Sequence, residues 1–147
     1  TIIFKPNIDN RYSSNHIVSH NQSKMESVII NDINEIIDLS KEIDVVGIDE
    51  AQFFSNDLVS VSKKLARDNK RVLVAGLDTD FRGKPFGPMP ALMCESDYLD
   101  KLRAICVKCG NPASFSQRLI NDSEQVLIGE TDIYEARCRN CFNKEEN

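Results

Sequence analysis

Two Cys-x-x-Cys pairs carry the clearest chemical signal in this sequence. They are Cys106–Cys109 and Cys138–Cys141, and residues 110–137 separate them. A Cys-x-x-Cys turn places two sulfurs on one side of a tight knuckle, and two knuckles supply the tetrahedral set that zinc prefers. Because all four ligands would be protein sulfurs, we expect a structural and not a catalytic zinc site. A redox dithiol or an iron–sulfur site is the alternative for this pattern.

A second chemical signal is the acidic pair Asp49-Glu50, which directly follows the apolar run of residues 43–48. In open α/β sheets, ligands bind at the carboxyl ends of the strands. An aspartate at such a strand end can help to hold Mg²⁺, and a neighbouring carboxylate can accept a proton from an attacking hydroxyl. Strand ends also carry Asp or Glu merely to cap the next helix, and the pattern alone leaves both readings open.

Several elements must position these groups. Apolar runs predict strands at residues 2–4, 28–30, 43–48 and 71–76, while helices are expected after Asp32 and after Asn56 or Asp57. Fully apolar strands that alternate with amphipathic helices predict a parallel sheet covered on both faces. A short helix near residues 91–95 and a strand near residues 99–105 lead into the cysteine region. We expect Cys94, on that short helix, to be a buried small hydrophobe.

The Gly/Pro-rich stretch between Leu77 and Pro90 reads as a loop that contains Phe81 and Phe86. Aromatic residues in such a loop are hard to explain as core, so we expect these two to contact a ligand. By pattern alone Phe53, Phe54 and Phe115 are ordinary core residues. The pair His16 and His20 has helical spacing, but its Asn- and Ser-rich surroundings favour two solvated side chains.

Composition restricts the class of protein. The formal charge of −5 argues against a general nucleic-acid binder, and no apolar stretch approaches the length of a membrane span. The start of the chain shows no signal-peptide pattern. Paired cysteines without an export signal favour a reducing, cytoplasmic setting and metal binding over disulfides.

Several motifs together resemble those of type II (cytosolic, zinc-containing) thymidine kinases. The run from Gly47 to Phe54 is similar to the family's Asp-Glu-x-Gln-Phe-Phe segment, and both zinc knuckles have counterparts. The other similar segments occur in the family's order: Asp9 to Tyr12, Gly76 to Gly87, Ser116-Gln117-Arg118 and Tyr134 to Cys138.

This resemblance implies roles for individual residues. Glu50 matches the general base for the 5′-hydroxyl of thymidine, and the phosphate and Mg²⁺ side is matched by Asp9, Arg11, Asp49 and Gln52. Apolar contacts to the nucleoside are matched by Phe53, Leu77, Phe81 and Phe86. Ser116 matches the residue that lies near the thymine methyl group, and Tyr134 matches the residue that lies under the sugar. The backbone that reads the base edge is matched by Gln125, Val126, Leu127, Ile128 and Gly129.

The fold expected from pattern and resemblance is a P-loop-type parallel sheet with helices on both faces, over residues 1–103. A small zinc-binding subdomain with a lasso-like loop, residues 104–147, would cover the nucleoside. By resemblance the protein is a cytoplasmic homotetramer that uses thymidine and ATP with Mg²⁺, with dTTP as feedback inhibitor. No nucleic-acid or membrane partner is expected.

The family holds the ATP phosphates with a Walker A loop, Gly-x-x-x-x-Gly-Lys-Ser/Thr, and this sequence contains no such motif. We therefore expect the 147-residue chain alone not to phosphorylate thymidine. Two rival functions are also compatible with the sequence. One is a related P-loop deoxynucleoside kinase or NTPase with another acceptor, and the other is a zinc-ribbon module that binds nucleic acid or protein.

Overall fold

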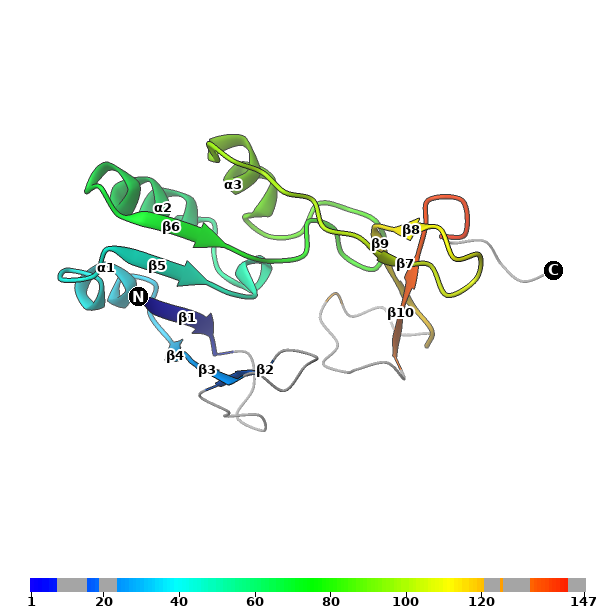
Figure 1. Cartoon of the computed structure of the whole chain (residues 1–147), viewed down its shortest axis with the longest axis horizontal. Helices are drawn as coiled ribbons and strands as arrows, with labels where there is room; N and C mark the ends of the chain where they lie inside the picture. Colours follow the sequence, from blue (N-terminus) through cyan, green and yellow to red (C-terminus); the bar gives the residue numbers. More distant parts are fainter. Residues whose placement is uncertain (8–15, 19–23, 121–124, 126–132, 143–147) are drawn as a thin grey trace. The chain divides into compact units, whose positions relative to one another are not determined.

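The computed structural model describes residues 1–7, 16–18, 24–120, 125 and 133–142. The chain forms two compact units (Figure 1). The first unit comprises Thr1–Leu77 and Gly87–Ser96, and the second comprises Asp78–Phe86 and Asp97–Asn147. The loop that begins at Asp78 therefore belongs to the same unit as the cysteine region. A domain boundary at residue 103 stays a prediction.

A four-stranded parallel sheet organises the first unit. Its strand order is β4 (Val28–Ile30), β1 (Ile2–Pro6), β5 (Val45–Ile48), β6 (Arg71–Val74), as Figure 1 shows. Phe4 is in register with Ile48, and Ile48 with Val74, so all carboxyl ends of these strands lie at one edge. The predicted α/β class with a parallel sheet is confirmed.

The core of this unit forms where the sheet meets three helices, α1 (Glu35–Leu39), α2 (Asp57–Arg67) and α3 (Met89–Glu95). Helix α2 presents Leu58, Val61 and Leu65 as one buried stripe, the spacing expected for a helix that lies on a sheet. Burying each leucine fully stabilises the fold by about 1.5–3 kcal/mol. The stripe packs with core residues from the sheet and the other helices: Phe4, Val46, Ile48, Ile36, Met89 and Leu92.

Three local predictions need correction. The first helix begins at Glu35, because the Asp32 carboxylate accepts the Asn34 backbone N–H and shapes a turn before the helix. Cys94 is exposed, since it lies two positions, about 200° of helical rotation, beyond the buried Leu92. The strand expected over residues 99–105 shortens to β7 (Ala104–Ile105).

The second unit contains two small antiparallel ladders. Strand β7 pairs with β8 (Pro112–Ala113), and β9 (Phe115–Arg118) pairs with β10 (Tyr134–Arg137). A further antiparallel pair, β2 (His16–Val18) with β3 (Lys24–Glu26), lies in the first unit. Within the described ranges, no helix has the length and apolar character needed to cross a membrane.

Candidate active site and metal centre

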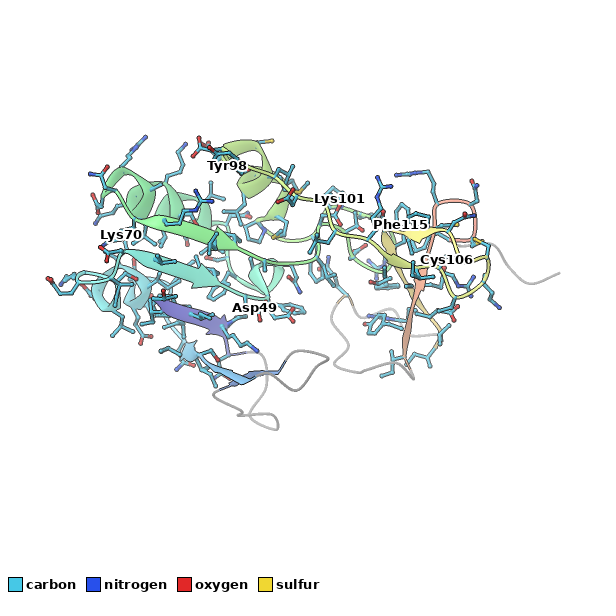
Figure 2. All side chains as sticks on the ribbon, in the orientation of Figure 1. Asp49, Lys70, Tyr98, Lys101, Cys106 and Phe115 are labelled. Atoms are coloured by element: carbon cyan, nitrogen blue, oxygen red, sulfur yellow. The ribbon has the colours of Figure 1, made fainter. Side chains whose placement is uncertain are left out.

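The four paired cysteines converge in the second unit. The Sγ atoms of Cys106, Cys109, Cys138 and Cys141 all lie within 4.8 Å of one another, and those of Cys109 and Cys138 are 3.5 Å apart. Sulfurs around a tetrahedral zinc ion at about 2.3 Å stand about 3.8 Å from each other. The cluster therefore fits a metal with a closed, four-sulfur coordination shell, and Cys106 marks its place in Figure 2.

Backbone hydrogen bonds shape both knuckles. The Gly110 N–H donates to the Cys106 carbonyl (2.9 Å), and Gly110 has a φ of +72°, a conformation that glycine adopts without strain. The second knuckle closes with the Cys141 N–H on the Cys138 carbonyl (3.0 Å). Arg137, nearly buried on β10, donates to the Cys141 carbonyl (3.1 Å) and pairs with Glu135. Hydrogen bonds to the backbone thus hold each Cys-x-x-Cys turn in its shape.

The cluster also perturbs its own thiols. A hydrogen bond from the Cys138 backbone lowers the pKa of Cys106 to about 6. Burial raises the pKa of Cys138, but hydrogen bonds with the Cys109 and Cys141 sulfurs outweigh it and lower that pKa overall. Hydrogen bonding with Cys109 raises the pKa of Cys141 to about 12. The pKa values of Cys106, Cys138 and Cys141 thus depart from the ordinary value because the cysteines lie close enough to form hydrogen bonds with one another.

In the first unit, the acidic pair lies where β5 ends, as predicted (Asp49 in Figure 2). Glu50 adopts a left-handed backbone conformation, with φ 54° and ψ 39°. Its N–H donates to the Asp49 carboxylate (3.0 Å), and the other Asp49 oxygen lies 3.6 Å from the Lys5 ammonium. Asp49 is partly exposed, so its carboxylate can still reach a cation at the sheet edge.

Gln52 joins the Asp49–Glu50 pair to the segment that follows β6. It lies on the 3-10 turn η1 (Ala51–Phe53) and is only 3% exposed. Its Nε2 donates to a Glu50 carboxylate oxygen at 2.6 Å, and its Oε1 accepts the Leu77 N–H at 3.0 Å. The structure therefore brings together three predicted site residues, Glu50, Gln52 and Leu77, within one unit.

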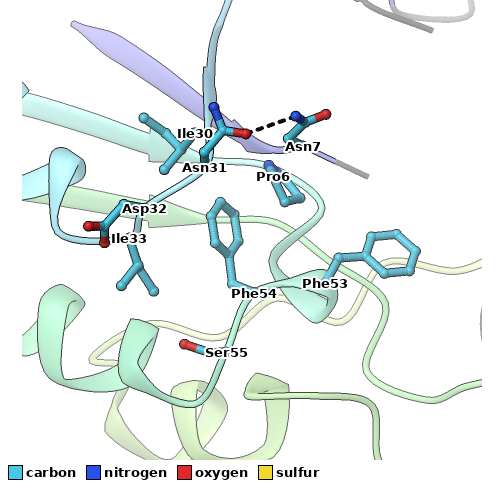
Figure 3. A pocket seen from close by; sticks show the side chains of 9 residues that line it. All are labelled: Pro6, Asn7, Ile30, Asn31, Asp32, Ile33, Phe53, Phe54 and Ser55. Carbon is cyan, nitrogen blue, oxygen red and sulfur yellow. Dashed lines mark hydrogen bonds between the residues drawn. The ribbon is translucent and has the colours of Figure 1, made fainter. Parts of the chain in front are cut away.

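A pocket of about 380 Å³ opens beside the turn η1, at the carboxyl ends of β1 and β4 (Figure 3). Part of its lining is apolar. On the polar part, the Asn7 side-chain amide donates a hydrogen bond to the Asn31 side chain (2.8 Å). Phe54 turns toward Pro6 and packs against the core, whereas Phe53 turns away. Phe53 is the only predicted site residue among those that line the pocket: Pro6, Asn7, Ile30, Asn31, Asp32, Ile33, Phe53, Phe54 and Ser55.

The second unit gathers another group of predicted residues around Arg118, to which the family resemblance assigned no role of its own. Its guanidinium carbon lies 3.6 Å from the centroid of the Phe81 ring. The same group donates to the Tyr134 hydroxyl (2.6 Å) and to the Gln125 carbonyl (3.3 Å). Arg118 is nearly buried, and its place in the Ser-x-Arg motif of β9 was the available signal.

Asp80 is a second residue that was missed. It is 2% exposed, and its Oδ1 accepts the backbone N–H groups of Arg82 (2.9 Å) and Lys84 (3.0 Å). The other oxygen accepts the side-chain amide of Gln125 (3.2 Å). Asp80 thereby orders the loop that carries Phe81 and ties this loop to Gln125.

The remaining predicted residues are placed as follows. Ser116 lies on β9 opposite Ala136, and Phe86 is buried at the end of the loop. Phe115 stacks on Phe142, with ring centroids 4.5 Å apart, which agrees with a packing role. Asp9, Arg11 and the stretch from Val126 to Gly129 lie outside the described residues, as does His20.

Comparison with known proteins places these features in context. A family model described as thymidine kinase matches residues 1–142. A thymidine kinase of Bacteroides fragilis (strain YCH46) is 52% identical over 142 residues, which cover 97% of this chain and 71% of that protein. A thymidine kinase of Bacteroides thetaiotaomicron is 52% identical over 140 residues, or 95% of this chain and 70% of that protein.

Proposed function

The chain belongs to the thymidine kinase family, and we propose that its protein transfers the γ-phosphate of ATP to the 5′-hydroxyl of thymidine. The observation that carries this proposal is the Glu50 carboxylate, held by Gln52 at the ligand-binding edge of the sheet. In the reaction, Glu50 accepts the hydroxyl proton while the O5′–Pγ bond forms. The bond from Pγ to the β-phosphate oxygen breaks, ADP leaves, and dTMP is the product.

Asp49 is the proposed carboxylate on the Mg²⁺ side. Its partly exposed oxygen, paired only loosely with Lys5 at 3.6 Å, fits a role in which a cation is exchanged in and out with substrate. Mg²⁺ bound with the triphosphate neutralises charge on the transferred phosphoryl group. Asp9 and Arg11 are proposed for the same side on the basis of the family motif.

The nucleoside contacts are proposed from the family motifs and from the second unit's geometry. Phe53, Leu77, Phe81 and Phe86 would form apolar walls, and Tyr134 would lie under the sugar. Ser116 is proposed for the thymine methyl, and the backbone of residues 125–129 for the polar edge of the base. Support for the last assignment comes from Gln125, which Arg118 and Asp80 hold from two sides.

The four-cysteine cluster is proposed to hold a structural zinc ion. With four sulfur ligands the ion has no open position, so it contributes folding free energy and no chemistry to the reaction. Resemblance to the family further implies a cytoplasmic homotetramer inhibited by dTTP, with no nucleic-acid partner. These assignments are part of the same proposal.

A nucleoside panel tests the proposed reaction. The full-length protein is incubated with MgATP and, separately, with thymidine, deoxycytidine or deoxyguanosine, and formation of the monophosphate is measured. We expect kcat/KM for thymidine to exceed the other two by at least about 100-fold, since buried polar groups of the site are left unpaired by the wrong base. Preference for another nucleoside would assign a different acceptor, and ATP hydrolysis without nucleoside transfer would contradict the kinase.

A further inference from the structure

We infer that Gln52 is a positioning residue, which fixes the carboxylate of Glu50 for proton transfer and acts through Glu50. This inference rests on the proposed function, because it assigns a role within the same site. The family resemblance puts Gln52 near the phosphates, but both polar atoms of its amide are engaged elsewhere. Its Nε2 donates to Glu50 and its Oε1 accepts from Leu77.

The orientation of this amide is determined by its partners. The Leu77 backbone N–H is a donor, so it must meet the amide oxygen, and the NH₂ group must then face Glu50. The Glu50 carboxylate oxygen that lies 2.6 Å from that NH₂ group accepts its hydrogen bond and is held in place by it. One Glu50 oxygen is thereby engaged, and the other oxygen takes the proton of the attacking hydroxyl.

Two glycines lie against Gln52, and a side chain at either position would clash with a neighbouring atom. A Cβ atom at Gly76 would lie 2.7 Å from the Gln52 Oε1 and 2.9 Å from the Met89 sulfur. At Gly87, where φ is +50°, a Cβ atom would lie 2.2 Å from the Gln52 carbonyl oxygen. The turn is also pinned at its start by the Ala51 N–H on the Ala75 carbonyl (3.0 Å). The absence of a side chain at Gly76 therefore leaves room for the Gln52 amide, and Gly87 leaves room for the Gln52 backbone.

The backbone of Glu50 makes this support necessary. A non-glycine residue in the left-handed region costs about 1–2 kcal/mol, and such residues persist where the surroundings enforce them. The strained backbone aims the Glu50 side chain, and the Gln52 amide stops its carboxylate from rotating. A catalytic group misplaced by about 1 Å can lose about 100-fold in rate, so the amide has a measurable effect on turnover.

Kinetics of Gln52→Met separate positioning from phosphate binding. Methionine keeps the length of the side chain and removes both polar atoms. In the full-length protein we expect kcat to fall by about 10–100-fold while KM for MgATP changes by less than about 2-fold. Glu42→Met, at an exposed position before β5, is the control and should leave kcat unchanged. A raised KM for MgATP with a normal kcat would show that Gln52 binds phosphate and would overturn the inference.

A double-mutant cycle with Glu50→Gln tests whether Gln52 acts through Glu50. Once the carboxylate is gone, Gln52→Met has nothing left to position, so the double variant should be no slower than Glu50→Gln alone. Additive losses of rate would mean an independent role for Gln52. If the wild-type protein does not phosphorylate thymidine, or Glu50→Gln keeps its rate, it is the proposed function that fails.

Two measurements keep the inference testable if Gln52→Met does not fold or the kinase assay fails. Gly76→Ala displaces the amide without changing Gln52, and should lower kcat by about 10-fold, whereas Gly47→Ala on β5 should not. In NMR spectra, the side-chain amide of Gln52 should shift in the Glu50→Gln variant. An unshifted resonance would refute the contact whatever the activity.

Discussion

At the scale of single residues, Arg118 links two predicted nucleoside contacts, since its guanidinium stacks on Phe81 and donates to the Tyr134 hydroxyl. A buried cation over an aromatic ring contributes about 2 kcal/mol, and each charged hydrogen bond about 1.5–3 kcal/mol. These free-energy contributions are large enough to hold both rings in place. Arg82 lies over the same Phe81 ring at 4.8 Å but is exposed, so its contribution is smaller.

This difference gives a residue-scale prediction. Replacing Arg118 by Met should raise KM for thymidine by about 10-fold with a smaller change in kcat, because the rings are no longer held. Arg82→Met should change KM by less than about 2-fold. Steady-state kinetics of the full-length variants check this. Equal effects of the two substitutions would show that Arg118 does not position the rings.

At the same scale, the sequence predicted Glu50 and Gln52 as site residues, but not the contact between them. That contact depends on the positive φ of Glu50 and on the space that Gly76 leaves, and neither is visible in a hydrophobic pattern. Asp80 was missed for a related reason. Its partners are backbone N–H groups of its own loop, and any acidic residue in a Gly/Pro-rich stretch looks solvated from sequence alone.

At the scale of elements, the loop of residues 78–86 is ordered by one buried carboxylate. Asp80→Ala would remove the acceptor of the part-buried hydrogen bonds from the Arg82 and Lys84 N–H groups, at a cost of about 1 kcal/mol for each bond. We expect the midpoint of thermal unfolding to fall by at least about 5 °C in calorimetry. Asp100→Ala, at an exposed position, is the matched control and should change it by less than about 2 °C. Similar midpoints for both variants would contradict the role of Asp80.

The sequence located the helices and strands correctly where their apolar residues pack into the core. Apolar runs located β5 and β6, and the Leu58–Val61–Leu65 stripe located α2, because each packs into one core. The predicted strand over residues 99–105 was too long, since Leu99 and Leu102 are 56% and 89% exposed and apolar character was mistaken for burial. Which strands neighbour each other depends on crossovers that no local pattern encodes.

At the scale of the whole molecule, the second unit should depend on the proposed zinc ion for its stability. Its buried apolar cluster is small, formed by Cys106, Ala113 and Cys138 with Ala136 and Cys141 against it. Removing zinc with a chelator should expose the backbone amides of β9 and β10 to rapid hydrogen exchange. The amides of α2, which pack in the first unit's core, should remain protected. Unchanged exchange in β9 and β10 after metal removal would contradict a structural zinc site.

The thiol pKa values predict how zinc affinity depends on pH. Near neutral pH, Cys106, with a pKa of about 6, is mostly thiolate, whereas Cys141, with a pKa of about 12, is protonated. Zinc uptake must therefore release protons, and its affinity should rise with pH and fall more steeply once pH drops below about 6. Competition with a chromophoric chelator between pH 5.5 and about 8 measures this. A flat profile would show that the four sulfurs do not bind as thiolates.

The role of Glu50 as the base is tested most directly by single-turnover phosphoryl transfer. The full-length protein and its Glu50→Gln variant are mixed with labelled ATP, and the reactions are quenched rapidly. If Glu50 takes the proton of the thymidine 5′-hydroxyl, the variant should transfer phosphate about 10²–10⁴-fold more slowly while binding thymidine nearly as well. A variant that transfers phosphate at the wild-type rate would contradict the assignment of Glu50 as the base.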